Sequence, residues 1–269
     1  ALSYVIDVTQ GKIEAEKNFL KVSLFVCYFP QLSEGPFGRY GELACEMTKG
    51  DPIDGDNFYR GLLLALWGLF KVFIVSYRLS VYTSAIFGNF TAYAGWTVAL
   101  GVVIFTLQLY TDFSGSIDVV RGISCIFGIR LAKNFDLPFL SKDVGEFWRR
   151  WHISLGAWFR DYVYIPCGGS RAGTVRTIAN LLLVWLLTGI WHGANWTFLL
   201  WGVYYGILLL LEKFVLQRAL EHLPGLLRHV LTLLLVLIAG CAWNLWYLNR
   251  MCTQLDHAVA QAETSCAAG

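Results

Sequence analysis

Charge is scarce in this sequence. Asp, Glu, Lys and Arg together make up 15% of the 269 residues, whereas a soluble domain has about 25%. The formal net charge is only +2, which argues against nucleic acid as a partner. The sequence contains none of the motifs GxxxxGK[ST], GxGxxG and HExxH, and it has no internal repeat of fixed period. Phosphate-loop, dinucleotide-binding and HExxH zinc-protease sites are therefore not indicated.

Paired cysteines are also missing. The seven cysteines are odd in number, scattered and without CxxC spacing, which argues against a zinc site and against a disulfide scaffold. We expect most of them to act as small apolar residues in helices. They are Cys27, Cys45, Cys125, Cys167, Cys241, Cys252 and Cys266.

The N-terminus has no initiator Met and no signal-peptide pattern. The chain begins inside a weakly apolar segment, ALSYV. From this start we predict that the chain is incomplete at its N-terminus.

Apolar residues, by contrast, are abundant. Hydrophobic residues make up 56% of the sequence, Trp occurs 11 times, and the mean hydropathy is +0.52. Several runs reach the roughly 20 apolar residues that cross a bilayer. We predict an all-α, polytopic transmembrane helical bundle over residues 1–248, followed by a polar tail at residues 249–269. The expected spans are residues 58–76, 92–110, 178–211 as one or two helices, and 230–248.

His192 lies near the middle of the longest apolar run, residues 178–211, which is either one over-long helix or two segments broken near Gly189 and Gly193. An ionisable side chain at membrane depth is expensive, so it usually faces a protein interior or a wet cavity and indicates function. The alternative is a structural histidine whose ring bonds a neighbouring helix. Position alone does not separate these two interpretations.

Residues 142–164 predict a single in-plane interfacial helix. Ser141 is the expected N-cap, and apolar residues rich in Trp recur at helical spacing on one face, while basic residues lie off it. The excess of basic residues over 142–176 favours a cytoplasmic location. His152 lies beside the apolar stripe, where contact with lipid headgroups is the simpler interpretation. Residues 77–91 are also expected to lie along the interface.

Polar residues follow the span at residues 92–110. Gln108 and Asp112 are spaced i,i+4, Asp118 and Arg121 i,i+3, and Gly115 and Gly122 allow a close approach of neighbouring helices. These polar residues either tie the bundle together or line a substrate path, and the structural role is slightly favoured. Within the span at residues 58–76, Lys71 is expected to reach toward the membrane surface.

Two long blocks resemble a known family. The segments NFDLPFLSKDVGEFWRRWHISLGAWFRDYVYIPCGGSR and LTGIWHGANWTFLLWGVYYG resemble the membrane-bound O-acyltransferase (MBOAT) family, and more closely its bacterial alginate O-acetyltransferase branch. YTDFSGSIDVVRG and FPQLSEGPFGRY match that branch too, so the resemblance covers most of residues 1–215. Family members have further spanning helices before residue 1 and after residue 248, and the tail departs from the pattern, which implies a fragment. Cys167 stands in the IP-x-GG turn, where members of the branch commonly have an apolar residue. We interpret it as a simple apolar replacement rather than as an acyl-carrying thiol.

The resemblance implies a multi-pass protein of the bacterial inner membrane that transfers an acyl group to a hydroxyl within a tunnel. His192 matches the near-invariant histidine of the family, and His152 matches a second histidine typical of the branch. No bound cofactor or metal is expected. Acetyl-CoA or an acylated carrier would be the cytoplasmic donor, and an exported polysaccharide together with an outer-side acetyltransferase would be the partners, beside membrane lipids.

From these assignments we predict a mechanism. His192 is the expected general base, kept uncharged by burial among Trp191, Trp196 and Leu187. Asn195 is a candidate hydrogen-bond donor to the oxyanion or the substrate, and His152 would orient donor or acceptor. The three arginines of the 142–164 segment would bind donor phosphates or anionic lipid. The residues expected to contact substrate or donor are Trp148, Arg149, Arg150, Trp151, Arg160, Trp191, Asn195 and Asp112.

Two other functions stay open at this point. D-alanyl transfer to teichoic acid belongs to the same family, but that branch generally lacks the YIP-x-GGSR turn and the WHGANWTF sequence. A proton-coupled membrane carrier would use intramembrane Asp112, Asp118 and His192.

Overall fold

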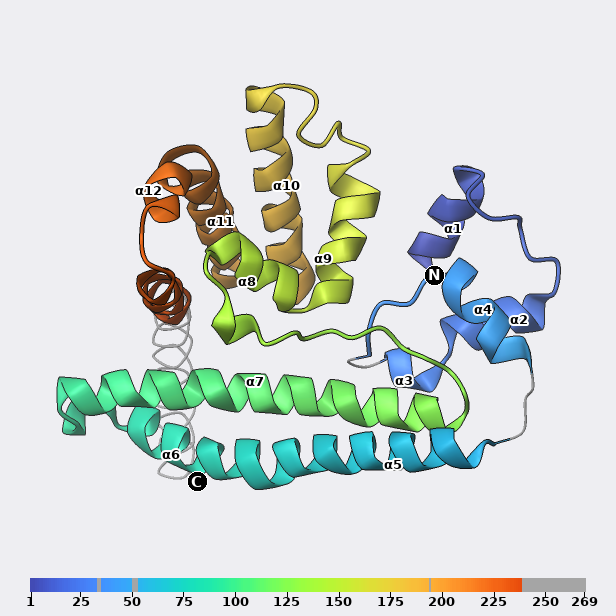
Figure 1. Cartoon of the computed structure of the whole chain (residues 1–269), viewed down its shortest axis with the longest axis horizontal. Coiled ribbons are helices and arrows are strands. Elements are labelled where there is room, and N and C mark those ends of the chain that lie inside the picture. The colour runs from blue at the N-terminus through green and yellow to red at the C-terminus, as the bar shows by residue number, and fades with distance from the viewer. Residues whose placement is uncertain (33–34, 50–52, 194, 239–269) are drawn as a thin grey trace, which may run out of the picture.

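The computed structural model describes residues 1–32, 35–49, 53–193 and 195–238. These residues form helices and connecting loops, and within them no β-strand occurs beyond one isolated bridge between Phe135 and Trp151. The all-α prediction is confirmed (Figure 1). Part of the expected last span, residues 239–248, and the predicted polar tail at 249–269 lie outside the described residues.

Twelve α-helices are assigned among the described residues, and a further apolar helix spans Gly225–Ile238. Three π-helical segments, Phe70–Ser76, Arg160–Tyr164 and Glu212–Leu216, continue α5, α9 and α11. The α-helices are α1 (Leu2–Thr9), α2 (Phe19–Val26), α3 (Phe29–Leu32), α4 (Tyr40–Lys49), α5 (Gly55–Leu69), α6 (Tyr77–Gly88), α7 (Gly95–Ile126), α8 (Val144–Arg150), α9 (Ile153–Phe159), α10 (Thr174–His192), α11 (Trp196–Leu211) and α12 (Gln217–Glu221).

Four helical stretches of the described chain are long and apolar enough to cross a membrane: Gly55–Gly88, Gly95–Ile126, Thr174–His192 and Trp196–Glu221. Between 11% and 28% of each apolar window is buried inside the chain, so most of these side chains face outward, as in lipid-facing helices. The expected separate segment at residues 77–91 is wrong, because the π-helical segment carries α5 directly into α6. The long run at residues 178–211 breaks at Gly193, into α10 and α11.

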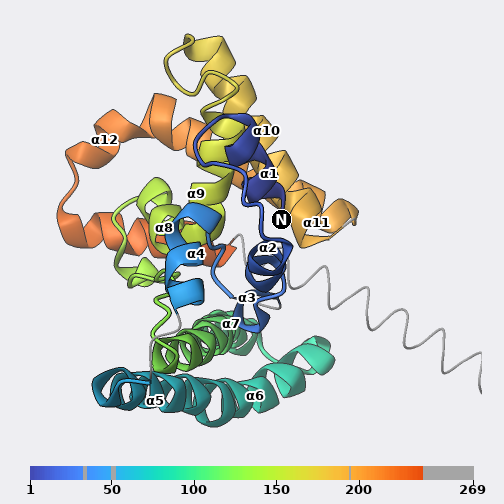
Figure 2. The ribbon, with the colours of Figure 1, turned by 90° about the vertical axis from the view of Figure 1, so that its right-hand side faces the viewer.

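The continuous helix formed by α5 and α6 packs along α7, and this is the most extensive helix–helix contact among the described residues. The two lie side by side in both views (Figures 1 and 2). Gly61 and Gly68 of α5 face Gly122 and Gly115 of α7, and the glycines of each helix are seven residues apart. A Cβ on Gly61 would come within 2.5 Å of the carbonyl oxygen of Gly122. The predicted close approach at Gly115 and Gly122 is confirmed, since only glycine leaves room for these backbones.

The polar residues of this pair bind each other. Asp118 accepts from Lys71 Nζ at 2.6 Å and from Arg121 at 3.2 Å, so the i,i+3 pairing is confirmed, and Lys71 points inward rather than to the membrane surface. Gln108 and Asp112, which are spaced i,i+4, do not bond each other in the described structure. The Gln108 side-chain oxygen instead accepts from the Thr83 hydroxyl at 2.6 Å, which ties α7 to α6.

The single helix expected over residues 142–164 is broken in two. Trp151 is extended, and His152 adopts the left-handed conformation with φ of 49° and ψ of 52°. Backbone hydrogen bonds to the preceding loop hold the break, because Asp136 N donates to Arg150 O at 2.9 Å and Ile153 N donates to Asn134 O at 3.0 Å. The expected in-plane position of this segment stays a prediction.

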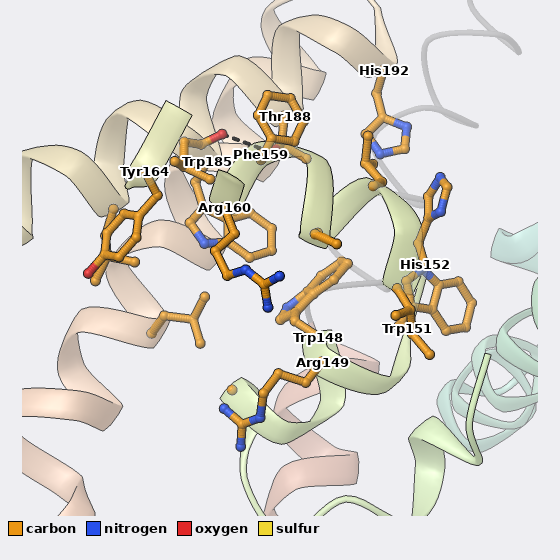
Figure 3. Close-up of a pocket in the computed structure, with 18 residues that line it drawn as sticks. Trp148, Arg149, Trp151, His152, Phe159, Arg160, Tyr164, Trp185, Thr188 and His192 are labelled. Atoms are coloured by element: carbon orange, nitrogen blue, oxygen red, sulfur yellow. Dashed lines mark hydrogen bonds between the residues drawn. The ribbon is translucent and has the colours of Figure 1, made fainter. Parts of the chain in front are cut away.

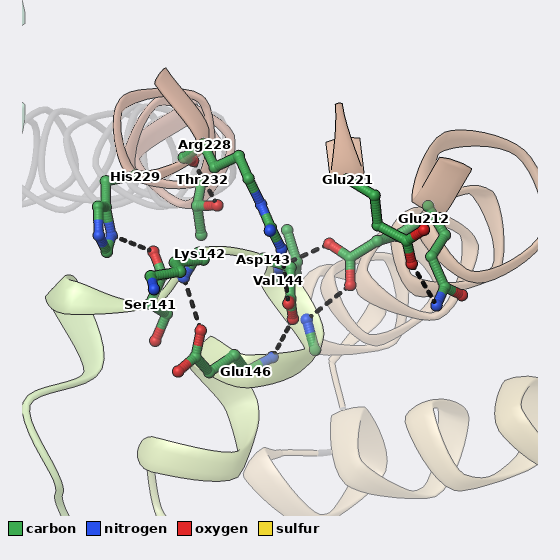
Figure 4. A network of polar contacts seen from close by, with 12 residues as sticks. Ser141, Lys142, Asp143, Val144, Glu146, Glu212, Glu221, Arg228, His229 and Thr232 are labelled. Carbon is green, nitrogen blue, oxygen red and sulfur yellow. Dashed lines mark hydrogen bonds and ion pairs between the residues drawn. The ribbon is translucent and has the colours of Figure 1, made fainter. Parts of the chain in front are cut away.

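The N-terminus of α8 is capped by two carboxylates (Figure 4). The N-cap is Asp143, whose side chain accepts from Glu146 N, and not Ser141 as the sequence indicated, because the Ser141 hydroxyl donates to Pro138 O. Glu212, at the end of α11, accepts from Val144 N at 2.6 Å and from Gly145 N at 2.9 Å. This contact joins α8, which carries several candidate site residues, to the α10–α11 hairpin.

Replacing Glu212 with Ala is expected to destabilise the protein by about 1–3 kcal/mol, because the N–H groups of Val144 and Gly145 lose their acceptor. Thermal unfolding of the purified protein in detergent measures the change. Glu221→Ala is the matched control, since Glu221 pairs only with Gln217 of its own helix at 3.3 Å in the described structure. Equal unfolding temperatures for the two variants would contradict a role for Glu212 in holding α8.

Candidate active site

Two cavities meet at the histidines that the sequence indicated, and Figure 3 shows the lining of one of them. One has a volume of about 390 Å³ and the other of about 280 Å³. Four residues line both cavities, namely Trp148, Trp151, His152 and His192. The two histidines, 40 positions apart in the chain, therefore stand at a wall shared by two spaces.

The larger cavity is lined by two arginines as well as by apolar residues and both histidines. Arg149 and Arg160 line it, with 71% and 62% of their side chains exposed, and Tyr164, Trp185 and Thr188 contribute to its wall (Figure 3). Cations therefore lie along the wall of a mostly apolar space that also reaches both histidines. Such a space suits a molecule with an anionic end and an apolar or neutral reactive end.

The smaller cavity is aromatic. Its wall comes from α7, the loop before α8, α8 itself, α11 and the helix Gly225–Ile238. Beyond the four shared residues it is lined by Phe105, Thr106, Leu109, Phe113, Phe139, Phe147, Phe198, Trp201, Tyr205 and Val236.

His192 is the last residue of α10 and is positioned by rings. Its imidazole lies 4.8 Å from the Trp191 ring centre and 5.1 Å from that of Trp201, and it stacks on Phe198 at 6.1 Å. The predicted burial among Trp191, Trp196 and Leu187 is wrong in part. Trp196 is 74% exposed, and His192 itself is exposed, because the chain turns at Gly193 instead of continuing as a helix.

His152 is buried, with 6% of its surface exposed. Its left-handed backbone is uncommon for a residue other than glycine, and such strain is found mainly at functional sites. Phe113 contacts the ring edge-to-face at 4.9 Å, and Phe37 and Trp191 lie 6.0 Å away. Burial, together with the nearby His192, lowers the pKa of His152 to about 3, so the ring is uncharged near neutral pH.

Asn134 holds His152 in place. It is fully buried, and its amide lies 3.1 Å from Nδ1 of His152. Its side-chain oxygen accepts from Ser154 N at 2.9 Å and from the Ser154 hydroxyl at 2.8 Å. Ser154 Oγ in turn accepts from Phe37 N at 3.0 Å, which connects the site to the segment before α4.

A charged cluster stabilises the far end of α9. Asp161 accepts from both Arg160 and Arg39. Burial alone would raise the pKa of the Asp161 carboxyl, but the two guanidinium groups hold it below its usual value. Tyr162 donates to Asp7 at 2.7 Å, and burial together with Asp7 raises the pKa of Tyr162 to about 12. These contacts fix α1 and the segment near Arg39 against the helix that carries Arg160.

The structure brings together most of the predicted site residues. Trp148, Arg149, Trp151 and Arg160 line the larger cavity with both histidines. Trp148 packs on Trp185 and Tyr205 at 4.7 Å each, and its buried indole N–H has no hydrogen-bond partner among the described residues.

Four predicted residues lie outside the two cavities. Arg150 pairs with Glu146 at 2.7 Å, and Asp112 is on the exposed face of α7. Asn195 caps α11 by accepting from Thr197 N. Trp191 is 49% exposed and contacts the rings of both histidines from outside the cavities.

Sequence reasoning missed Asn134, Ser154 and Phe37 as site residues. Asn134 entered the sequence analysis only as the first residue of the long block, NFDLPFLSK and onward, that resembles the family. Neither Asn134 nor Ser154 is marked by its neighbours in the sequence, since Lys133 and Asp136 flank Asn134 and His152 precedes Ser154. Nothing in the spacing shows that Asn134 reaches across 18 positions to His152.

Comparisons with known proteins identify the family of this chain. The sequence model of the membrane-bound O-acyltransferase family matches residues 14–255. The chain is 39% identical over 240 residues to "Probable alginate O-acetylase AlgI" of Pseudomonas syringae pv. tomato, covering 88% of this chain and 46% of that protein. It is 36% identical over 201 residues to "Peptidoglycan O-acetyltransferase" of Helicobacter pylori, covering 73% of this chain and 38% of the relative.

A more distant relative is "Teichoic acid D-alanyltransferase" of Bacillus subtilis, 27% identical over 228 residues, which cover 78% of this chain and 55% of that protein. The chain thus spans about half the length of the curated relatives it matches. The family match covers nearly all of the described residues, both histidines included. The chain belongs to the membrane-bound O-acyltransferase family.

Proposed function

We propose that the whole protein transfers an acetyl group from a cytoplasmic thioester to hydroxyl groups of an exported polysaccharide. The observation that supports this most is the meeting of two cavities at His152 and His192. A donor in one space and an acceptor in the other would place a carbonyl and a hydroxyl at the same wall. The alginate and peptidoglycan O-acetyltransferase relatives support acetyl as the group and a polysaccharide as the acceptor.

The chemistry needs a base at this wall. The acceptor oxygen forms a bond to the thioester carbonyl carbon, the carbon–sulfur bond breaks, and the hydroxyl proton passes to His192. The departing thiolate then takes that proton from His192, which returns the base to its uncharged form. A histidine suits this proton transfer near neutral pH. The rings of Phe37, Phe113 and Trp191 around the buried His152 limit the access of water on that side of the wall, where water would otherwise hydrolyse the thioester.

The donor is acetyl-CoA or an acylated carrier, and Arg149 and Arg160 of the larger cavity bind its phosphates. Both donor types carry phosphate near the thiol arm. The same two cations could equally bind anionic lipid headgroups. The KM for the donor, measured in an arginine variant, distinguishes these two roles.

Arg149→Ala is expected to raise the KM for the donor about 3- to 10-fold and to leave kcat nearly unchanged, because an exposed cation contributes binding rather than chemistry. Initial rates in membranes at varied acetyl-CoA concentration measure both constants. Arg150→Ala is the matched control, since Arg150 pairs with Glu146 outside the cavities. An Arg149→Ala protein with the wild-type KM would return this arginine to a lipid-binding role.

Product analysis tests the proposed function. Cells expressing the whole protein are fed isotope-labelled acetate, the exported polysaccharide is purified, and mild base releases its esters for mass spectrometry. Released acetate is the expected result. Released D-alanine would favour the activity named for the Bacillus relative. Polysaccharide exported without new ester would favour a carrier and would overturn the proposal.

The carrier alternative has less support from the polar residues. Asp118 is paired with Lys71 and Arg121, and neither Asp118 nor Asp112 lines the two cavities. A proton-coupled path would need carboxylates that face the transported substrate. The proposal also places the protein in the inner bacterial membrane, together with an acetyltransferase partner on the outer side. An exported polysaccharide is modified after it leaves the cytoplasm, so the acetyl group has to reach that side.

A further inference from the structure

The two histidines have different hydrogen-bonding environments. We propose that His152 is a hydrogen-bond donor through Nε2–H to the carbonyl oxygen of the acyl group, not a second base, and that Asn134 is the positioning residue that fixes this tautomer. The donor role rests on the proposed acyl transfer. The tautomer itself follows from the hydrogen-bond directions alone.

Two backbone N–H groups set those directions, since a backbone N–H can only donate. Phe37 N donates to Ser154 Oγ at 3.0 Å, so this oxygen acts as an acceptor there. Ser154 N donates to the Asn134 side chain at 2.9 Å, so the atom of Asn134 that faces Ser154 is its oxygen. The Ser154 hydroxyl proton then goes to the same oxygen at 2.8 Å.

The orientation of the Asn134 amide follows. With its oxygen toward Ser154, its nitrogen faces Nδ1 of His152 at 3.1 Å. An amide nitrogen has hydrogens but no available lone pair, so it donates and Nδ1 accepts. A neutral imidazole with an unprotonated Nδ1 carries its proton on Nε2.

Burial keeps the ring neutral, since Phe37 and Phe113 contact it and no carboxylate is found against it among the described residues. The amide hydrogens of Asn134 would also oppose a second proton on Nδ1. The left-handed backbone of His152 is held by the same residue, because Asn134 O accepts from Ile153 N at 3.0 Å. Asn134 thus fixes both the backbone and the ring of one histidine.

Nε2 lies on the ring edge away from Asn134, and it has no hydrogen-bond partner within the described part of the chain. The His152 ring lines both cavities and lies beside His192 (Figure 3). A donor there meets the carbonyl oxygen that becomes negative when the acceptor hydroxyl attacks. His192 takes the hydroxyl proton, and His152 stabilises the oxyanion without giving up its own proton. His192 must therefore accept a proton, whereas His152 must keep its own proton and donate a hydrogen bond.

Asn134→Asp separates this proposal from the alternative of a second base. The carboxylate still accepts from Ser154, but it cannot donate to Nδ1, so the His152 proton moves to Nδ1 and Nε2 becomes an acceptor. We expect kcat to fall about 10²- to 10³-fold, as when one oxyanion donor is removed, with little change in the KM for the donor. If His152 were a base at Nε2, the same variant would maintain or raise kcat, which would overturn the proposal.

Two further variants guard against a merely structural effect. His152→Gln places an amide donor near the position of Nε2 and should retain at least about tenfold more kcat than His152→Leu, which has no donor. Equal kcat values for these two variants would contradict the donor role. Lys133→Ala is the control next to Asn134 and should leave kcat unchanged, since within the described residues Lys133 forms only an exposed ion pair with Asp136.

Nitrogen NMR of histidine-labelled whole protein reads the tautomer without an activity assay. The His152 signals are those missing from the spectrum of His152→Gln. We expect a protonated Nε2 and an unprotonated Nδ1 in the wild type, and the reverse in Asn134→Asp. A wild-type ring protonated at Nδ1 would overturn the tautomer assignment. Absent acetyl transfer with the expected NMR pattern would instead refute the proposed function and, with it, the donor role.

Discussion

Replacing His192 with Ala is expected to lower acetyl transfer by about 10³-fold while the protein reaches the membrane at the wild-type level. General-base catalysis contributes about 10²- to 10⁴-fold, and the described structure offers no other base at the shared wall, because His152 is held as a donor. The variant should still fold. His192 is exposed at the end of α10, and its ring makes no hydrogen bond within the described residues.

The measurement is ester-linked acetate on exported polysaccharide, normalised to the amount of protein in the membrane. His222→Ala is the matched control, because His222 is exposed beyond α12 and its ring bonds only the backbone of Arg218 at 2.6 Å in the described structure. Wild-type acetate in the His192→Ala strain would show that His192 is structural. The catalytic assignment would then be wrong even though the family is right.

Most of the fold was predictable because a membrane constrains a sequence strongly. Apolar runs of sufficient length leave few alternatives to spanning helices, and the predicted run at residues 178–211 is formed by α10, which begins slightly earlier at Thr174, and by α11. The boundaries were less accurate. The π-helical segment Phe70–Ser76 leaves no compositional signal, so the continuation of α5 into α6 was missed. The break at Trp151 and His152 depends on Asn134 and Asp136, which lie far away in the sequence.

The site was predictable to the extent that its chemistry shows in residue type. His192 stood out because an ionisable group in an apolar run is costly, and it does line both cavities. The arginines could not be ranked from the sequence. Arg149 and Arg150 are neighbours, yet one faces the larger cavity and the other pairs with Glu146. The Asn134–Ser154 pairing needed the structure, because a hydrogen-bond network is set by tertiary geometry.

Asp118→Ala is expected to destabilise the protein by about 3–5 kcal/mol, which is the largest stability effect that the described residues indicate. Asp118 lies between Lys71 at 2.6 Å and Arg121 at 3.2 Å, and the side chains of all three are less than a quarter exposed. Removing the carboxylate leaves two cations in an apolar helix pair. Among the described residues, Lys71 then keeps only its contact with the Ser114 hydroxyl at 3.0 Å, and Arg121 keeps the Leu131 carbonyl.

Unfolding of the purified protein in detergent and its level in the membrane measure this effect. The triple variant Lys71→Met, Asp118→Leu and Arg121→Met tests the cause, because removing all three charges and filling the space should restore most of the lost stability. A triple variant as unstable as Asp118→Ala would mean that packing at Gly68 and Gly115, and not the two unpaired cations, controls the helix pair.

The activity of the folded fraction of Asp118→Ala separates the helix pair from the catalytic wall. None of the three charged residues lines either cavity that contains the histidines. We therefore expect wild-type kcat per folded molecule, with a reduced number of folded molecules. A fall in kcat per folded molecule would instead place Asp118 on the path of the acceptor or of the transferred proton. The α5–α7 pair would then belong to the catalytic apparatus and not only to its support.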